Sequence, residues 1–300
     1  TTVTGSIISG EGLHDIDVIN SSTVTGNITT GNGNATIDVI DSVVGVLDTS
    51  GDITTADGDD IITITDSIVY GSISTGDGDD TIVIDPSLVH NSISTGIGND
   101  SVEISGSVVG DAVNLDGDIT MGIDNDNNTG TNALSISAIE DYAATVYGDV
   151  AMFSDTSNTV SLDGEVILNL AYNAIDAVYA ASIGTVDVDG TVLTAGDLSM
   201  SALVYDGDAI TQVGTNVLTM GEVSSIGGDV SMDAGLSNTF TVDSGWIYEY
   251  IGGGPLVGSE YLQSYVTSID MAGHSNLLNI AGGTLAVTDD TIGIQMGQLT

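Results

Sequence analysis

A repeat of twenty residues between Gly51 and Gly110 limits this chain to a small set of folds. Three copies begin at Gly51, Gly71 and Asn91, and they read GDITTADGDDIITITDSIVY, GSISTGDGDDTIVIDPSLVH and NSISTGIGNDSVEISGSVVG. Self-similarity at a short fixed period is typical of one supersecondary unit stacked on itself. Each copy then packs mainly against its two neighbours, so we expect a solenoid.

Aliphatic residues recur at the same four positions of each copy, and polar residues lie between them. The predicted core columns are Ile53, Ile73 and Ile93; Ile62, Ile82 and Val102; Ile64, Ile84 and Ile104; and Ile68, Leu88 and Val108. Alternation of period two predicts short strands with one buried face, and the abundance of β-branched residues disfavours helices. A coil of this length has room for two or three strands of about four residues. The sequence therefore predicts an all-β fold, a narrow parallel β-solenoid.

The corners of the repeat carry acidic and amide residues between glycines. They read GNGNA at residues 31–35, ADGDD at 56–60, GDGDD at 76–80 and GIGND at 96–100. Stacking places such turns about 4.8 Å apart. Two carboxylates at that distance repel by roughly 1 kcal/mol in water and by about 3.5 kcal/mol at an effective dielectric near 20. The chain has 43 Asp and Glu residues and no Lys or Arg to relieve this repulsion.

A hard divalent cation is one remedy, because glycine-flanked turns present the carboxylate and carbonyl oxygens that Ca²⁺ prefers. We therefore predict a row of calcium sites along one edge of the solenoid. The predicted ligands are Asn32, Asn34, Asp57, Asp59, Asp60, Asp77, Asp79, Asp80, Asn99 and Asp100. A plainer interpretation stays open, since Asp, Asn and Gly are common in any tight turn and Asp often caps its own backbone without metal.

The run from Thr75 to Val83 resembles the nonapeptide G-G-x-G-x-D-x-U-x of RTX (haemolysin-type) calcium-binding β-rolls. Gly76 and Gly78 match two of the glycines, Asp80 the ligand Asp, and Ile82 the buried aliphatic residue, whereas Thr75 replaces the first Gly. The resemblance covers roughly residues 5–110 and implies a calcium-binding solenoid. A β-roll has two such nonapeptides per coil, but the opposite corner here lacks the motif, so the resemblance implies a single calcium row.

Composition excludes several classes of function. A formal net charge of −43 with no Lys or Arg excludes binding to nucleic-acid phosphate, which requires cationic side chains. It also rules out a P-loop lysine or an arginine clamp. The chain has no Cys and hence no disulfides. No apolar run is long enough for a transmembrane segment, and the start at Thr1 without a signal peptide suggests a processed or excised piece.

The location follows from the predicted metal. Calcium sites of the extracellular class bind at around 10⁻⁴ to 10⁻³ M. A repeat that needs the ion to fold therefore fits a secreted protein, outside the cell or at its surface.

The repeat divides the chain into a regular part and an irregular part. Residues 1–110 are expected to form the regular coils, with an insertion at 44–50, and residues 111–300 to continue the solenoid less regularly. In the second part a Gly-Asp-x-x-Met signature recurs, with an Asn-rich turn expected after each copy. We expect its methionines to stack in one core column; they are Met121, Met152, Met200 and Met232, with a looser echo at Met271.

Three insertions interrupt the second part. Apolar spacing predicts helices at 138–147 and 172–181 that cover the side of the solenoid. An aromatic loop begins at Trp246 and extends to Tyr265. That loop either covers the core or forms a contact patch for another subunit, a surface protein or a glycan, because Tyr and Trp dominate interface anchors.

Three functions are compatible with these features. The first is a calcium-dependent structural protein that self-assembles, because the first coil lacks a cap and end-to-end contacts generate a filament, sheath or surface layer. The second is a stalk or binding module of a larger RTX-type adhesin. The third, a polysaccharide-degrading solenoid enzyme, uses paired carboxylates. We do not expect an enzyme, because the acidic residues recur on every coil and His14, His90 and His274 are far apart in the sequence.

Overall fold

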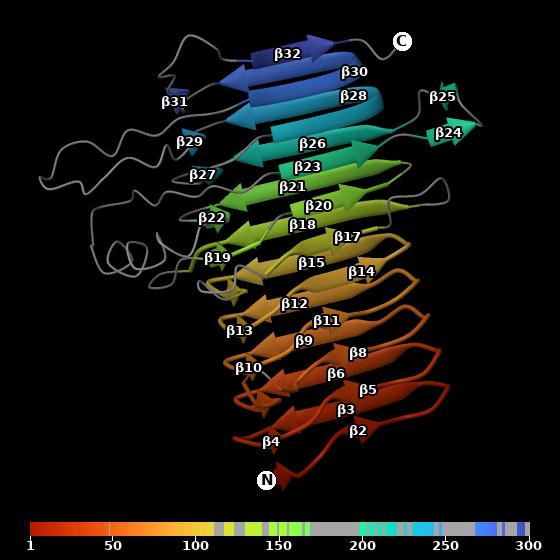
Figure 1. Cartoon of the computed structure of the whole chain (residues 1–300), viewed down its shortest axis with the longest axis vertical. Coiled ribbons are helices and arrows are strands. Elements are labelled where there is room, and N and C mark those ends of the chain that lie inside the picture. Colours follow the sequence, from red (N-terminus) through yellow and green to blue (C-terminus); the bar gives the residue numbers. More distant parts are fainter. Residues whose placement is uncertain are drawn as a thin grey trace, which may run out of the picture.

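The computed structural model in Figure 1 is a long stack of β-strands. It describes residues 1–47, 49–110, 117–122, 130–139, 144–148, 150–154, 156–163, 166–168, 198–202, 204–206, 209–211, 214–220, 225–226, 230–242, 246–247, 268–280, 284–285 and 293–297. Every regular element in these residues is a β-strand. Both large sheets are parallel, so the predicted all-β parallel solenoid is confirmed. A small antiparallel pair joins β24 (Val204–Asp206) to β25 (Ala209–Thr211).

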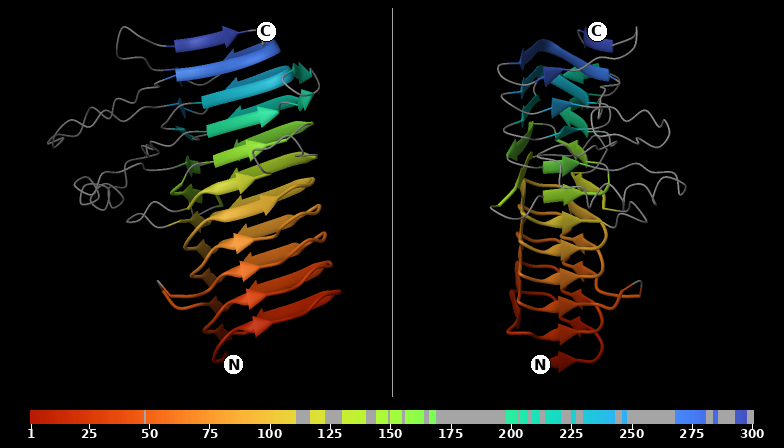
Figure 2. Two further views of the ribbon diagram at one scale, coloured as in Figure 1. Left: turned by 45° about the vertical axis from the view of Figure 1, so that its right-hand side comes forward. Right: turned by 90° about the vertical axis from the view of Figure 1, so that its left-hand side faces the viewer.

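Each coil contributes one strand to each of three rows that run the length of the stack (Figures 1 and 2). Row 1 contains β2 (Ile7–Ile8), β5 (Ile28–Thr29), β8 (Ile53–Thr54), β11 (Ile73–Ser74), β14 (Ile93–Gly96), β17 (Ile119–Met121), β20 (Val150–Phe153), β23 (Leu198–Ala202), β28 (Val230–Val242), β30 (Ser268–Ile280) and β32 (Gly293–Gly297). Row 2 contains β3 (His14–Ile19), β6 (Ala35–Ile40), β9 (Ile61–Thr65), β12 (Thr81–Asp85), β15 (Asp100–Ser105), β18 (Thr131–Ser137), β21 (Ser157–Asp163) and β26 (Thr215–Met220), and continues in the second halves of β28 and β30.

Row 3 forms an 11-stranded sheet of its own. It contains β1 (Thr2–Val3), β4 (Thr23–Val24), β7 (Val43–Val44), β10 (Ile68–Val69), β13 (Leu88–Val89), β16 (Val108–Val109), β19 (Ala144–Val146), β22 (Val166–Leu168), β27 (Ser225–Ile226), β29 (Trp246–Ile247) and β31 (Thr284–Leu285). The long strands β28 and β30 pass from row 1 into row 2, so these two rows merge into a 19-stranded sheet.

The interior consists of columns, each column being the residues at one position on successive coils. Three of the four predicted columns are confirmed, because their members are fully buried. These members are Ile53, Ile73 and Ile93; Ile62, Ile82 and Val102; and Ile64, Ile84 and Ile104. The fourth was wrong by one residue. The inward residues of row 3 are Val24, Val44, Val69, Val89 and Val109.

The error arises at the corner between rows 2 and 3. The turn shifts the alternation by one residue in all three coils; Asp66 and Gly106 adopt left-handed conformations there, with φ of 49° and 52°, whereas Pro86 occupies this position in the middle coil. A shift of one residue exchanges the two faces of a strand. Ile68, Leu88 and Val108 therefore point outward and are only partly buried.

The predicted methionine column is confirmed in the second part of the chain. Met121, Met152, Met232 and Met271 are fully buried, and the backbone register that links them also includes Met200 and Met296. Both large sheets continue without a break past residue 110. The unbranched Met side chain suits a core whose coils differ in length, because it fills irregular gaps.

The predicted insertions have mixed outcomes. The helix expected at 138–147 is wrong, because Ala144–Val146 form strand β19 with all three residues buried. The helix expected at 172–181 lies outside the described residues, as does most of the aromatic loop, of which Trp246 and Ile247 form β29. The insertion at 44–50 is closed by a bridge from Val46 to Ser50 and exposes Val46 and Leu47.

Candidate functional site: the acidic corner

The predicted ligands lie at the corner between rows 1 and 2, but they point in two directions. Asp60, Asp80 and Asp100 begin or immediately precede strands of row 2, face the interior, and are 0, 1 and 2% exposed. The remaining seven predicted ligands are exposed on the outside of the turn; they are Asn32, Asn34, Asp57, Asp59, Asp77, Asp79 and Asn99. The corner therefore contains an inner column and an outer row.

Backbone hydrogen bonds connect the carboxylates of the inner column. The backbone N–H of Ala35 donates to Asp60 Oδ1 at 2.7 Å, that of Asp60 to Asp80 Oδ1 at 2.9 Å, and that of Asp80 to Asp100 Oδ1 at 3.2 Å. In each pair the donor belongs to the coil nearer the N-terminus. The aspartates thus tie each coil to the next, as the plainer interpretation of turn residues anticipated.

The second oxygens of these carboxylates differ in their partners. Thr95 Oγ1 donates to Asp100 Oδ2 at 2.6 Å. Among the described residues, Asp60 Oδ2 and Asp80 Oδ2 are buried without a hydrogen bond of good geometry, although the Thr55 and Thr75 side chains act to lower the pKa of these two carboxyl groups. A buried carboxylate oxygen without a partner is costly unless a proton or a cation neutralises the group. The inner column therefore needs one of the two.

Burial raises the pKa of all three carboxyl groups of the inner column. The pKa of Asp80 rises to about 6 and that of Asp100 to about 7, mainly through desolvation, while the pKa of Asp60 is raised for the same reason. Neighbouring carboxylates add to each shift, as Asp60 does for Asp80. Protons therefore bind readily here, and a neutral carboxyl group removes the repulsion that the sequence predicted.

The inner column continues beyond the acidic corners as a ladder of buried asparagines. Asp100 pairs in register with Asn132, which pairs with Asn158, and the column proceeds through Asn216 and Asn238. The side-chain amide of Asn132 donates to Asn158 Oδ1 at 3.2 Å, that of Asn158 to Asn216 Oδ1 at 3.1 Å, and that of Asn216 to Asn238 Oδ1 at 3.0 Å. A single stacked polar position therefore extends through both parts of the chain.

Sequence analysis missed this ladder. It placed Asn158 and Asn238 in the Asn-rich turns expected after the Gly-Asp-x-x-Met copies, whereas both lie within strands and are buried. The available signal was the recurring pair of Ser or Thr followed by Asn, at 131–132, 157–158, 215–216 and 237–238. Inward amides in a stack satisfy each other, which removes the usual cost of burying Asn.

The outer row forms a second ladder that runs in the opposite sense. The backbone N–H of Asp59 donates to Asn34 Oδ1 at 3.1 Å, that of Asp79 to Asp59 Oδ1 at 3.1 Å, and that of Asn99 to Asp79 Oδ1 at 3.0 Å. Here the donor belongs to the coil nearer the C-terminus. The hydrogen bond from the Asn99 backbone lowers the pKa of Asp79. The Asp79 carboxylate therefore stays ionised.

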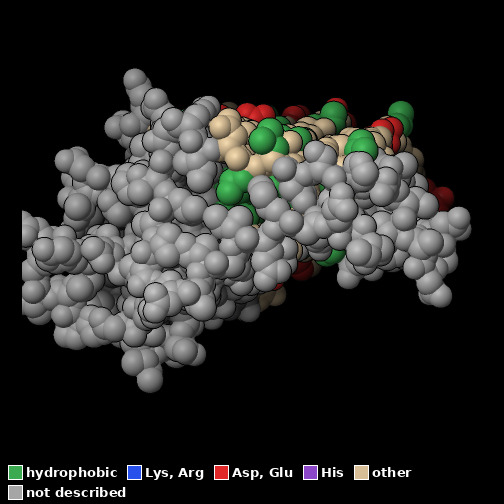
Figure 3. All heavy atoms as spheres, turned by 90° about the horizontal axis from the view of Figure 1, so that it is seen from above, with side chains coloured by type: hydrophobic (Ala, Val, Ile, Leu, Met, Phe, Trp, Pro, Cys, Tyr) green, Lys and Arg blue, Asp and Glu red, His purple; other side chains and the backbone are tan. Residues whose placement is uncertain are grey.

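The outermost ligands make weaker contacts. Asn32 Nδ2 donates to Asp57 Oδ2 at 3.2 Å, and the Ile97 backbone N–H lies 3.4 Å from Asp77 Oδ1. These side chains leave most of their oxygens facing solvent. Figure 3 shows exposed carboxylates along an edge of the molecule.

Glycines allow the outer turns to stack closely. A Cβ at Gly98 would overlap the carbonyl oxygen of Gly78, and one at Gly130 would overlap that of Gly98. The turns enclose a shallow groove of about 470 Å³ that also includes Asp59, Asp79 and Asn99. Glycine is required here by the close approach of successive backbones.

The donor chemistry of the groove fits calcium, which prefers carboxylate, amide and carbonyl oxygens. No three His, Cys, Asp or Glu side chains converge on one point anywhere in the described residues. A calcium ion bound in this groove would therefore draw part of its oxygens from Asn99 and from backbone carbonyls. The residues that would hold it are Asp59, Asp79 and Asn99.

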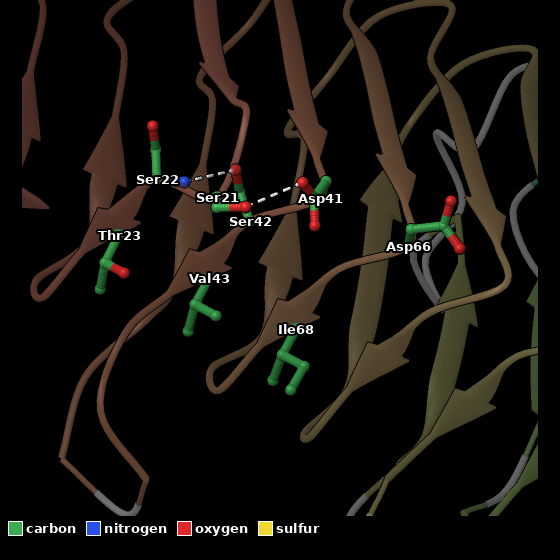
Figure 4. A pocket seen from close by; sticks show the side chains of 8 residues that line it. All are labelled: Ser21, Ser22, Thr23, Asp41, Ser42, Val43, Asp66 and Ile68. Carbon is green, nitrogen blue, oxygen red and sulfur yellow. Dashed lines mark hydrogen bonds between the residues drawn. The ribbon is translucent and has the colours of Figure 1, made fainter. Parts of the chain in front are cut away.

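The corner between rows 2 and 3 carries a second hollow of about 340 Å³ (Figure 4). Ser21 donates to Asp41 Oδ2 at 2.9 Å, and the backbone N–H of Ser42 donates to Ser67 Oγ at 3.0 Å. The same serine bond recurs between Ser67 and Ser87 and between Ser87 and Ser107. Serine hydroxyl groups therefore connect successive turns at this corner, which also carries the carboxylates of Asp41 and Asp66.

Comparison of the chain with protein-family models, with curated proteins and with solved structures gives no match. In the described residues no helix is long and apolar enough to cross a membrane.

Proposed function

We propose that this chain is a structural protein, a rigid solenoid whose exposed strand edges join further copies end to end in an extracellular filament, sheath or surface layer. This is the first of the three functions considered above. The exposed apolar residues of the first coil support it.

The apolar edge of the first described coil carries the proposal. Within the part of the chain that the structure describes, strands β1, β2 and β3 each pair on one side only. Ile8 is 78% exposed and Leu13 is 86% exposed. Ile7 and Ile16 are only partly buried, although their successors in the same columns are fully buried. An exposed apolar strand edge is a template for pairing with another chain.

Charge determines the conditions for assembly. Each copy carries a formal charge of −43, and like charges oppose association unless ions screen or neutralise them. The exposed carboxylates of Asp59 and Asp79 lie in the groove whose oxygens fit calcium. We propose that calcium bound there lowers the charge and joins adjacent turns. In that role the ion supplies only positive charge and coordination.

The experiment is assembly of purified protein, followed by light scattering and negative-stain electron microscopy. Samples in EDTA are compared with samples in Ca²⁺, in Mg²⁺ and in NaCl of equal ionic strength. We expect rods that lengthen with protein concentration and form most readily in Ca²⁺. Dispersed single copies under every condition would overturn the assembly, and an equal response to NaCl would overturn the calcium role.

A matched variant separates charge from hydrogen bonding. The double variant Asp59→Asn, Asp79→Asn keeps an oxygen acceptor at both positions, and Asn34 and Asn99 already occupy the same column. We expect this variant to fold and to lose the specific response to Ca²⁺. An unchanged response would show that the ion binds elsewhere.

A further inference from the structure

The first five coils share two register positions at the corner between rows 1 and 2, five residues apart, that are polar in almost every coil. Three coils combine a buried threonine with a buried aspartate: Thr55 with Asp60, Thr75 with Asp80, and Thr95 with Asp100. The first coil has Ser9 and His14 there, with Ser9 Oγ at 2.8 Å from His14 Nδ1. The second coil has Thr30 and Ala35. Among these five coils, only Ala35 brings no polar side chain to the inner column.

The Asp60 carboxylate, on the third coil, lacks a donor for one of its oxygens. Its Oδ1 accepts the backbone N–H of Ala35 at 2.7 Å, which holds the carboxylate beside the second coil. Thr55 also contacts this carboxylate, but it donates its hydroxyl proton to the carbonyl oxygen of Thr75 at 2.9 Å. A hydroxyl group has only one proton to donate. Asp60 Oδ2, which is buried, therefore needs a donor from another source.

Two further buried polar atoms near Ala35 have no hydrogen-bond partner among the described residues; they are Thr30 Oγ1 and His14 Nε2. Thr30 is 3% exposed. The equivalent hydroxyl of the fifth coil, Thr95 Oγ1, donates to the carboxylate five residues later at 2.6 Å, whereas the second coil has only the methyl group of Ala35 at that position. His14 is the register neighbour of Ala35 on the first coil.

His14 and Asp60 lie within electrostatic range of each other across Ala35. Burial raises the pKa of Asp60, and a charge on His14 opposes that shift. The three unpaired atoms thus belong to three successive coils, with Ala35 between them in register.

We propose that the space beside Ala35 binds one water molecule, enclosed by the first three coils, that hydrogen-bonds to Asp60 Oδ2, Thr30 Oγ1 and His14 Nε2. Ala35 lacks the carboxyl group that the later coils carry at this position, and a water molecule takes up about 30 Å³ in the liquid. Buried waters typically make about three hydrogen bonds to polar groups that the protein leaves unpaired. This site does not depend on the proposed assembly, since all its residues belong to one copy.

The ligand of this site must be able both to donate and to accept hydrogen bonds. An ionised Asp60 only accepts, and His14 Nε2 donates or accepts according to the tautomer that its contact with Ser9 selects. Water suits either tautomer. A metal ion would suit only a bare Nε2, and no three His, Cys, Asp or Glu side chains converge within the described part of the chain. An anion would be repelled by Asp60.

The number of long-lived internal waters, measured by oxygen-17 relaxation dispersion of the solvent, tests the proposal. The variant Ala35→Asn places an amide in the column, as Asn158 and Asn216 do in later coils. We expect this variant to hold one internal water fewer than the wild type. Its urea midpoint should rise, because a tethered amide replaces a molecule that must be immobilised. The control Ala133→Asn makes the same change on the exposed face of β18 and should leave the count unchanged. Equal counts for Ala35→Asn and the wild type would overturn the proposal.

The sign of a second substitution provides an independent measurement. Thr30→Val removes the hydroxyl group and nearly preserves the shape of the side chain. With water bound, this change removes one of its partners, so we expect a lower urea midpoint. A higher midpoint would overturn the proposal, because it would show that Thr30 Oγ1 is an unsatisfied group whose removal is favourable. A wild-type midpoint that is higher in NaCl than in choline chloride, without such a difference in Ala35→Asn, would overturn water in favour of a sodium ion.

Discussion

Asp100 and Asn132 occupy the same buried column on adjacent coils, one carboxyl group directly beside one amide in register. Asn132 Oδ1 has no hydrogen-bond donor among the described residues. An ionised carboxylate cannot donate to it, whereas a protonated carboxyl group carries a hydroxyl that can. The junction therefore favours a neutral Asp100, with the acidic and amide halves of the column forming one ladder.

The first prediction concerns replacement of a buried acid by the amide found elsewhere in its column. Asp100→Asn should stabilise the fold at pH 8 by about 1–3 kcal/mol, the scale of supplying a donor to one unsatisfied buried polar group, here Asn132 Oδ1. Urea unfolding followed by circular dichroism measures the change. The outer-row control Asp79→Asn should change stability little. Destabilisation by Asp100→Asn would indicate that a cation, not a proton, neutralises the inner column.

The second prediction is a dependence of stability on pH. The pKa values of Asp80 and Asp100 are raised to about 6 and about 7 from an ordinary value of 3.8, so the folded state binds protons more tightly than the unfolded state. Their favourable contribution is present below pH 3.8 and is lost as the pH rises through 6 and 7. The urea midpoint should therefore increase on acidification from pH 8 to pH 5.

A matched variant isolates the inner column from the general effect of the net charge. The triple variant Asp60→Asn, Asp80→Asn, Asp100→Asn should show a clearly flatter profile over the same range, because it lacks the groups that titrate. A wild-type midpoint that falls on acidification would contradict this account. Identical profiles for the two proteins would assign the effect to surface charge instead.

The third prediction concerns the asparagine ladder. Asn216→Ala removes the acceptor of the Asn158 amide and the donor to Asn238 Oδ1. Two buried polar groups lose a partner, and each such loss costs about 1–3 kcal/mol. A drop in the thermal midpoint is expected, with little change for Thr219→Ala, a partly exposed position on the same strand. An unchanged thermal midpoint for Asn216→Ala would mean that the ladder fixes the register of the strands without adding to stability.

The fourth prediction concerns close stacking of the outer turns. Gly98→Ala should destabilise the coils by roughly 1–3 kcal/mol, because the new methyl group overlaps the Gly78 carbonyl and forces the backbone to shift. Gly10→Ala is the control, since a Cβ there meets nothing within 4 Å. Urea midpoints of the two variants give the comparison. Equal midpoints would show that the turns are looser than described.

Much of the fold could be predicted from the sequence because a stacked coil repeats its requirements. The columns headed by Ile53, Ile62 and Ile64 were visible as period-two alternation, and the methionine column as a recurring signature. The column of row 3 was not, because the turn between rows 2 and 3 changes the phase by one residue. Two-residue strands are too short to reveal that change in the sequence.

The candidate site was only half predictable. The sequence by itself determined that acidic corners stack without any basic residue, and hence that their charge must be neutralised. It could not determine which carboxylates face inward, because Asp59 and Asp60 are adjacent and chemically identical. Only the tertiary structure decided this: strand alternation places Asp60 in the core and Asp59 in solvent, so burial raises the pKa of one while the other stays exposed.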